Sequence, residues 1–146
     1  MYNVLLCNVC ANSNGYGKVH VPAQLLVHLP STPDRPVAKC DRGIYLTLEW
    51  TQPDDVGAAD ITGYVIQYRG SPCLYSGIKQ DYELIEGYKY GTVNVAGNTT
   101  KFQFTDELEE QMRYEFAVAT VNAAGQGQFS QFSDNVDIDC GEHCCD

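Results

Sequence analysis

The sequence predicts an all-β fold, a Greek-key β-sandwich, from three observations. Residues 114–121 alternate between bulkier and smaller side chains with a period of two, which is typical of a half-buried strand with one face toward the core. Residues 122–127 contain an asparagine and two glycines, which tolerate positive φ, so the chain can reverse before residues 129–138 return as a second strand. Leu108 precedes Tyr114 by six residues, a spacing typical of the tyrosine corner at a Greek-key crossing.

Residues 1–28 repeat part of this pattern. A shift of 110 residues places Asn12 on Asn122 and Gly15 on Gly125, and the spacing is kept throughout. We interpret residues 1–28 as the last two strands of a preceding sandwich domain, and therefore the chain as a piece of a tandem array.

Residues 29–36 are predicted to be a linker between domains. Pro30, Pro33 and Pro36 fix φ and remove three backbone donors within seven residues. Such a segment favours an extended, semi-rigid spacer that would hold successive domains at a set distance.

The domain proper is predicted to span residues 37–138. It opens with an edge strand at 37–40, beside a proline. In the central strand that follows, four large apolar side chains alternate with smaller or polar ones and face the core: Ile44, Leu46, Leu48 and Trp50. In the third strand Tyr64, Ile66 and Tyr68 face the core, and Val65, Gln67 and Arg69 face outward.

A stretch of 31 residues separates Arg69 from the strand expected at 101–105, more than a plain connection needs. We expect a short strand at 82–85 and an enlarged loop or extra hairpin in the remainder. Tyrosine provides contact area at low entropic cost, so the tyrosines of this segment are the candidate partner surface. They are Tyr75, Tyr82, Tyr88 and Tyr90. Alternatively, they cap the open side of the sandwich.

Over residues 33–138 the chain resembles a fibronectin type III domain. The resemblance rests on the run Leu46-x-Leu48-x-Trp50, on Gly63-Tyr64-x-Ile66-x-Tyr68, and on Leu108, Tyr114 and Asn122-x-x-Gly125-x-Gly127 in order. It implies an immunoglobulin-like Greek-key sandwich of seven strands, with an enlarged loop between the third and fifth. The core signature would be Trp50, Tyr64, Tyr68, Leu108 and Tyr114. Residues 1–28 would then end another such domain, or an immunoglobulin domain, as Cys7-x-Val-x-Ala11-Asn12 also allows.

The charge distribution narrows the classes of partner. The first 69 residues carry five basic and six acidic side chains, whereas residues 70–146 carry four and thirteen. An acidic surface repels phosphate backbones and anionic lipid, so we expect no nucleic-acid binding and no membrane insertion. The expected partners are other proteins, including neighbouring repeats of the same chain or assembly.

No set of residues adds up to an active site, and we expect neither an enzyme nor a cofactor. A catalytic nucleophile needs an adjacent base. The sequence gives no basis for placing any of the three histidines next to a nucleophile and an acid within the domain. Residues 139–146 are predicted to be a cysteine-rich tail or linker. This tail contains a set of metal-ligand candidates, in which adjacent cysteines strain joint ligation: Cys140, His143, Cys144 and Cys145.

Two signals on compartment conflict. Seven cysteines, an odd number with no disulfide-framework spacing, favour reduced thiols inside a cell. Asn98-Thr99-Thr100 is a glycosylation sequon, which favours the outside. The sequence thus predicts a non-catalytic structural and scaffolding module of a multidomain repeat protein, by resemblance a spacer and interaction platform like the repeats of giant muscle and cytoskeletal proteins. The alternative is the extracellular segment of an adhesion molecule or receptor.

Overall fold

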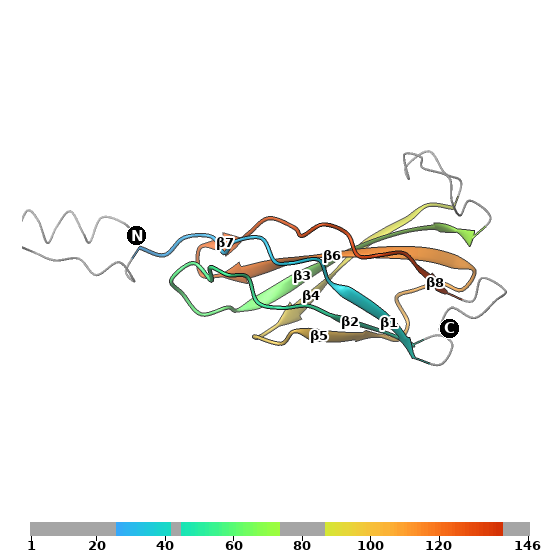
Figure 1. The fold of residues 1–146 in the computed structure, drawn as a ribbon, viewed down its shortest axis with the longest axis horizontal. Coiled ribbons are helices and arrows are strands. Elements are labelled where there is room, and N and C mark those ends of the chain that lie inside the picture. The colour runs from blue at the N-terminus through green and yellow to red at the C-terminus, as the bar shows by residue number, and fades with distance from the viewer. Residues whose placement is uncertain (1–25, 42–44, 74–86, 139–146) are drawn as a thin grey trace, which may run out of the picture.

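The described chain forms two antiparallel sheets that pack face to face (Figure 1). A computed structural model describes residues 26–41, 45–73 and 87–138. The smaller sheet has the order β1-β2-β5, with β1 at Val37–Asp41, β2 at Tyr45–Glu49 and β5 at Lys101–Phe104. The predicted all-β, immunoglobulin-like sandwich is therefore confirmed.

The larger sheet has the order β4-β3-β6-β7, and β8 also pairs with β6. Its strands are β3 at Gly63–Pro72, β4 at Lys89–Ala96, β6 at Met112–Asn122, β7 at Gly125–Gln126 and β8 at Val136–Ile138. All pairings in both sheets are antiparallel.

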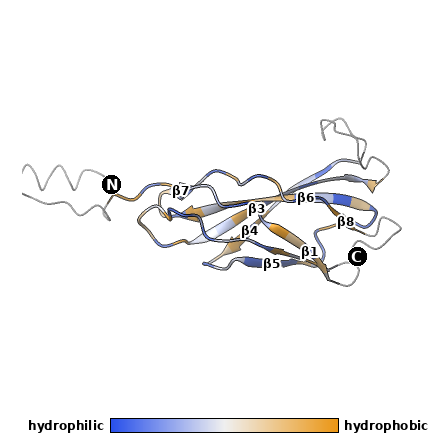
Figure 2. Ribbon diagram, viewed as in Figure 1, coloured by the Kyte–Doolittle hydropathy of each residue, from blue (hydrophilic) through white to orange (hydrophobic). Residues whose placement is uncertain are grey.

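The core lies between the sheets and is rich in aromatic rings. Phe104 of β5 lies 5.1 Å from Phe116 of β6 and 6.0 Å from Tyr68 of β3, measured between ring centroids, so one side chain contacts both central strands of the opposite sheet. Trp50 meets Tyr64 edge-on at 5.3 Å. Figure 2 shows hydrophobic and hydrophilic residues interspersed along the strands, as the period of two requires.

The prediction that only one face of β6 is buried was wrong. Tyr114, Phe116 and Val118 point into the core, but Ala117 and Ala119, on the other face, also have no exposed surface. Because β6 has paired strands on both sides, larger neighbouring side chains shield an alanine methyl, which rises little above the sheet.

The return strand predicted at 129–138 is broken into short pieces. Between β7 and β8, the backbone N–H groups of Ser130 and Ser133 donate to the carbonyls of Val118 and Phe116. The Oγ atoms of the same serines accept from the N–H groups of Val118, at 3.0 Å, and Phe116, at 3.1 Å. Two hydroxyls thus replace the backbone carbonyls of a regular ladder, which leaves eight strand segments in the described chain instead of seven.

The fourth strand lies later in the chain than expected. Residues 89–96, assigned to the enlarged loop or extra hairpin, form β4, which pairs with β3 from Gly63↔Ala96 to Gly70↔Lys89. Val95 is buried, and Val93 packs against the core opposite Ile66. The short strand predicted at 82–85 lies outside the described residues.

The spacing of Leu108 and Tyr114 corresponds to a tyrosine-corner contact. The Tyr114 hydroxyl accepts a hydrogen bond of 2.9 Å from the backbone N–H of Glu109, and Leu108 packs against the core. Burial raises the pKa of the Tyr114 hydroxyl above its usual value, so the group stays protonated and can also donate.

Candidate protein-interaction surface

The outer face of the larger sheet carries a row of side chains from three adjacent strands. The register aligns Tyr90 of β4, Arg69 of β3 and Glu115 of β6. Tyr90 is 55% exposed, the most of any large apolar or aromatic residue in the described chain, and its hydroxyl accepts a hydrogen bond of 3.2 Å from Gln67 Nε2. The exposed ring is therefore tethered to the sheet at its polar end.

Arg69 connects this row to the segment between β7 and β8. Its Nε donates to Glu115 Oε1, and its guanidinium carbon lies 3.9 Å from the centroid of the Phe132 ring. A guanidinium stacked on an aromatic ring is held by cation–π attraction as well as by its ion pair. The surface thus combines two rings with a charge that is already neutralised.

The surroundings of Tyr90 are mixed in charge, although the chain as a whole is acidic. Lys89 Nζ lies 3.1 Å from Glu109 Oε1. Further along β6, the Arg113 guanidinium binds both carboxylate oxygens of Asp137. Within the described residues, Arg69, Lys89 and Arg113 near this face each have an acidic partner, so these basic charges are locally balanced.

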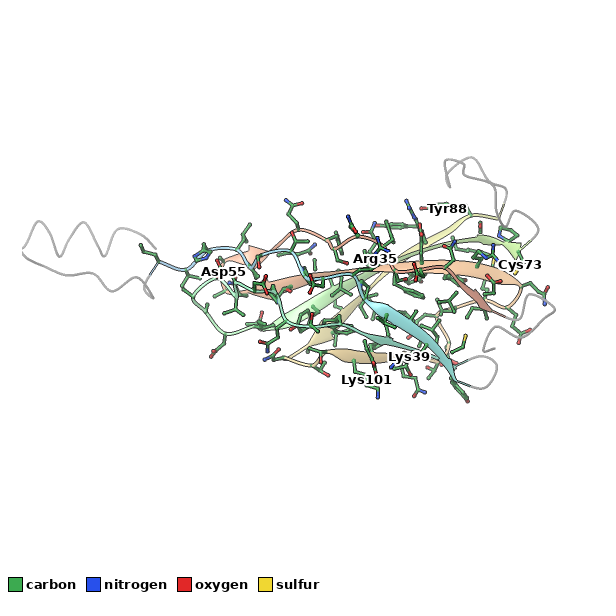
Figure 3. All side chains as sticks on the ribbon, in the orientation of Figure 1. Arg35, Lys39, Asp55, Cys73, Tyr88 and Lys101 are labelled. Atoms are coloured by element: carbon green, nitrogen blue, oxygen red, sulfur yellow. The ribbon has the colours of Figure 1, made fainter. Side chains whose placement is uncertain are left out.

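The four predicted tyrosines are only partly placed by the structure. Tyr90 is exposed, and Tyr88 is half-buried near Cys73, at the end of the sandwich opposite Asp55 (Figure 3). Tyr75 and Tyr82 lie outside the described residues. Sequence reasoning missed Phe132, because its contact with Arg69 joins segments more than sixty residues apart and no local pattern marks it.

Residues 29–36, expected to be a linker, lie along the body of the domain. The three prolines are buried. The backbone N–H of His28 donates to the Gly57 carbonyl at 3.0 Å, and that of Ser31 donates to the Asp55 carbonyl at 2.8 Å. Proline needs no backbone hydrogen-bond acceptor, so an irregular segment can be buried here with few unsatisfied donors.

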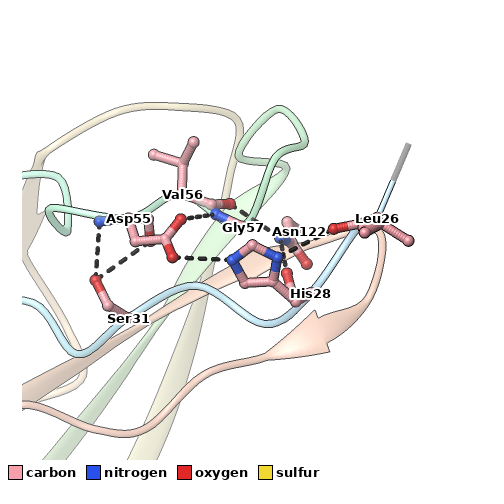
Figure 4. Close-up of polar contacts among 7 residues, drawn as sticks. All are labelled: Leu26, His28, Ser31, Asp55, Val56, Gly57 and Asn122. Atoms are coloured by element: carbon pink, nitrogen blue, oxygen red, sulfur yellow. Dashed lines mark hydrogen bonds and ion pairs between the residues drawn. The ribbon is translucent and has the colours of Figure 1, made fainter. Parts of the chain in front are cut away.

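Asp55 and Asn122 fasten this N-terminal junction, which we define as residues 28–31 with the loop around Asp55–Gly57. Asp55 Oδ2 lies 2.9 Å from His28 Nε2, and Asp55 Oδ1 accepts from the Gly57 N–H at 2.8 Å. Asn122 Nδ2 donates to the carbonyls of His28, at 2.7 Å, and Val56, at 3.0 Å. The junction thus joins the N-terminal segment to two loops at one end of the sandwich (Figure 4).

The ion pair between His28 and Asp55 makes the junction sensitive to pH. The hydrogen bond to Asp55 raises the pKa of the His28 imidazole, and the same bond lowers the pKa of the Asp55 carboxyl. The raised imidazole pKa contributes stability that is full below about pH 6.5 and is lost as the pH rises through the folded value. The lowered carboxyl pKa contributes stability that is full above about pH 3.9 and is lost on further acidification.

We therefore expect the contribution of the pair to be greatest between about pH 4 and pH 6.5. An NMR titration of His28 should give a pKa above the ordinary imidazole value, and Asp55→Asn, which keeps an acceptor for the Gly57 N–H, should lower it toward that value. If the pKa of His28 is the same in both proteins, the pair does not form in solution.

The candidate metal ligands Cys140, His143, Cys144 and Cys145 lie outside the described residues. Within residues 26–41, 45–73 and 87–138, no three His, Cys, Asp or Glu side chains gather in a way that could hold a metal ion. In the same ranges there is no helix of the length and apolar character needed to cross a membrane.

Comparisons with known proteins agree with this architecture. The family model described as "Fibronectin type III domain" matches residues 33–136. The protein sidekick homolog of Caenorhabditis elegans is 30% identical over 131 residues, which cover 84% of this chain and 5% of that protein. The homolog of Caenorhabditis briggsae matches to the same extent. The chain therefore spans about 5% of the length of these curated relatives.

Solved structures extend the likeness in fold. The twitchin kinase region of C. elegans superposes with a TM-score of 0.60 at 20% identity, over 80% of this chain and 18% of that one. The third fibronectin III domain of a human protein superposes with a TM-score of 0.59 at 17% identity, over 88% and 95% of the two chains. At such identities these structures indicate a shared fold and nothing finer.

Proposed function

Because this chain belongs to the fibronectin type III family, whose members are non-catalytic modules, we propose that it is a structural and protein-binding part of a larger repeat protein, acting as spacer and interaction platform. Its partners are other proteins, including neighbouring repeats. The observation that carries the platform role is the exposed, tethered ring of Tyr90 on β4.

Tyr90 has the properties of an interface anchor. A tyrosine ring contributes a large contact area with few rotatable bonds, and tyrosine is enriched where binding energy concentrates. The bond from Gln67 already restricts the ring, so less side-chain freedom is lost when a partner covers it. The Arg69–Phe132 stack lies beside it, because Arg69 is the β3 residue opposite Tyr90, and adds a second aromatic ring to the surface.

Strand β4 adds a backbone edge to this surface. Among the described strands, β4 pairs only with β3. The Gly97 N–H donates to the Thr62 carbonyl. Because hydrogen-bonded and non-hydrogen-bonded residues alternate along an antiparallel pair, this bond determines which β4 residues bond to β3. Residues Tyr90, Thr92 and Asn94 then direct their backbone N–H and C=O groups away from β3. An extended segment of a partner could pair there while its side chains contact Tyr90.

The spacer role is supported by the N-terminal junction. A segment fastened by Asp55 and Asn122 leaves the domain in a fixed direction, which a free tether does not. On this proposal residues 29–36 set the approach of a preceding domain whose last strands are residues 1–28, residues 37–138 form the module, and residues 139–146 lead onward.

The platform is tested by point substitution, because deleting residues 89–96 would remove β4 and the buried Val95. A photoreactive phenylalanine analogue that replaces Tyr90 within the parent protein should cross-link to one discrete neighbour. Tyr90→Ala should weaken binding to that neighbour about tenfold or more, with an unfolding free energy within about 0.5 kcal/mol of the original.

Tyr45 is the matched control for this test. It is 44% exposed and lies on β2 in the other sheet, so Tyr45→Ala should leave binding unchanged. Equal binding by the original and Tyr90→Ala proteins, or an equal loss in Tyr45→Ala, would refute the assignment of the surface.

A second candidate, an extracellular segment of an adhesion molecule or receptor, is favoured by one observation. Cys73, at the end of β3, is disulfide-bonded, in contrast to the reduced thiols expected from the cysteine count. Disulfides persist in oxidising compartments and are rare in the cytosol. The platform at Tyr90 would operate equally on either side of the membrane.

A further inference from the structure

The connection between β4 and β5 presents an asparagine that neither the platform nor the junction uses. Asn98-Thr99-Thr100 is the only Asn-x-Ser/Thr triplet in the sequence. Asn98 is exposed and follows Gly97, whose φ of 78° is typical of a glycine in a turn. A Cβ built on Gly97 would meet nothing within 4 Å, so the space around this turn is open.

The two ends of the Asn98 amide have different environments. The Tyr64 hydroxyl donates to Asn98 Oδ1 at 3.1 Å. Tyr64 is 1% exposed and packs edge-on against Trp50, so the carbonyl side of the amide is fixed to the core. Within the described part of the chain, Asn98 Nδ2 makes no hydrogen bond. The nitrogen is therefore the unengaged end of a side chain whose oxygen is anchored.

We infer that Asn98 carries an N-linked glycan. The inference rests on the second candidate function, because the transfer requires entry into the secretory pathway. The donor is an oligosaccharide linked to a polyprenyl pyrophosphate. Nδ2 attacks C1 of the first N-acetylglucosamine, the N–C bond forms, the C1–O bond breaks, and the polyprenyl pyrophosphate leaves while Nδ2 loses one proton.

The modification is compatible with the folded domain. A glycan on Nδ2 leaves Oδ1 as an acceptor, so the bond from Tyr64 remains and orients the first sugar. The backbone of Thr100, the third residue of the sequon, is also held to the domain, because its carbonyl accepts a hydrogen bond of 3.0 Å from the Trp50 N–H. No buried atom has to be exposed for the sugar to fit.

The glycan would lie far from the proposed binding surface. Six residue steps of β4 separate Tyr90 from Ala96, about 20 Å at the rise of an extended strand. Tyr90 therefore stays accessible, while the sugar covers the far end of the unpaired β4 edge. Covering an edge in this way hinders unwanted strand pairing.

The inference is tested with two neighbouring threonines in the full chain, directed through the secretory pathway of a eukaryotic cell. Thr100→Ala removes the sequon but keeps Asn98, and Thr99→Ala alters the adjacent residue but keeps the sequon. The original protein and Thr99→Ala should migrate more slowly than Thr100→Ala and shift to its position after treatment with peptide N-glycosidase. No difference between the three proteins would overturn the inference.

Protein isolated from its native source then distinguishes failure of the glycan inference from failure of the proposed extracellular function. Conversion of Asn98 to aspartate by the glycosidase, read by peptide mass spectrometry, supports the glycan. An unmodified Asn98 with Cys73 oxidised overturns the glycan and leaves the extracellular function standing. An unmodified Asn98 with Cys73 reduced overturns both.

Discussion

Replacing Phe104 with alanine is expected to lower the free energy of unfolding by about 3–5 kcal/mol. The ring has no exposed surface and contacts Phe116 and Tyr68 across the sandwich, so its removal leaves a cavity at the contact between the two sheets. Guanidinium denaturation at neutral pH measures the loss as a lower transition midpoint at an unchanged slope.

Phe102, on the same strand, is the control for this substitution. Its ring lies 4.9 Å from that of Phe104, but the residue is only half-buried. Phe102→Ala removes the same atoms from the same element and should destabilise less, because part of the lost contact is with solvent. If the two substitutions cost the same, the aromatic contact between the sheets does not hold them together as described.

Replacing Gly57 with alanine is expected to detach the N-terminal junction and to lower the free energy of unfolding by about 2–4 kcal/mol. The φ of Gly57 is 84°, a conformation that a Cβ disfavours. The added Cβ would lie 2.1 Å from the His28 carbonyl oxygen and 2.3 Å from Asn122 Nδ2. Hydrogen exchange should then show loss of protection at the amides of His28 and Ser31.

Gly97 provides a matched control for backbone strain. Its φ is 78°, but a Cβ there meets nothing within 4 Å. Gly97→Ala should cost about 1 kcal/mol and leave the amides of His28 and Ser31 protected. Equal protection of those amides in Gly57→Ala and in the original protein would show that the segment does not bind the Gly57 loop.

The core strands were predictable because their side chains are distinctive. In β2 and β3, large apolar residues such as Leu46, Leu48 and Ile66 alternate with polar ones, and one face of each strand is buried. Strand β4 carried a weaker signal, because at the edge of the sheet only Val93 and Val95 contact the core. An edge strand with few buried positions reads as a loop when no partner strand is known.

Features that depend on contacts distant in sequence were not predictable. The serine hydroxyls of Ser130 and Ser133 interrupt the return strand because they face the N–H groups of β6, which no local pattern reveals. Likewise, the prolines of residues 29–36 predicted an extended conformation, but they did not indicate the surface of the domain on which the segment lies. In the candidate site, the exposed Tyr90 belonged to the predicted set, whereas Arg69 and Phe132 required the fold to bring them together.

The placement of the N-terminal junction determines where the molecule would yield under tension. Pulling on the chain ahead of residue 26 loads the His28–Gly57 and Ser31–Asp55 bonds before any force reaches β1. Those bonds can peel away one at a time while the ladder between β1 and β2 remains intact. If the segment serves as a spacer under load, we expect the junction to detach first and residues 26–36 to extend while β1 stays paired with β2.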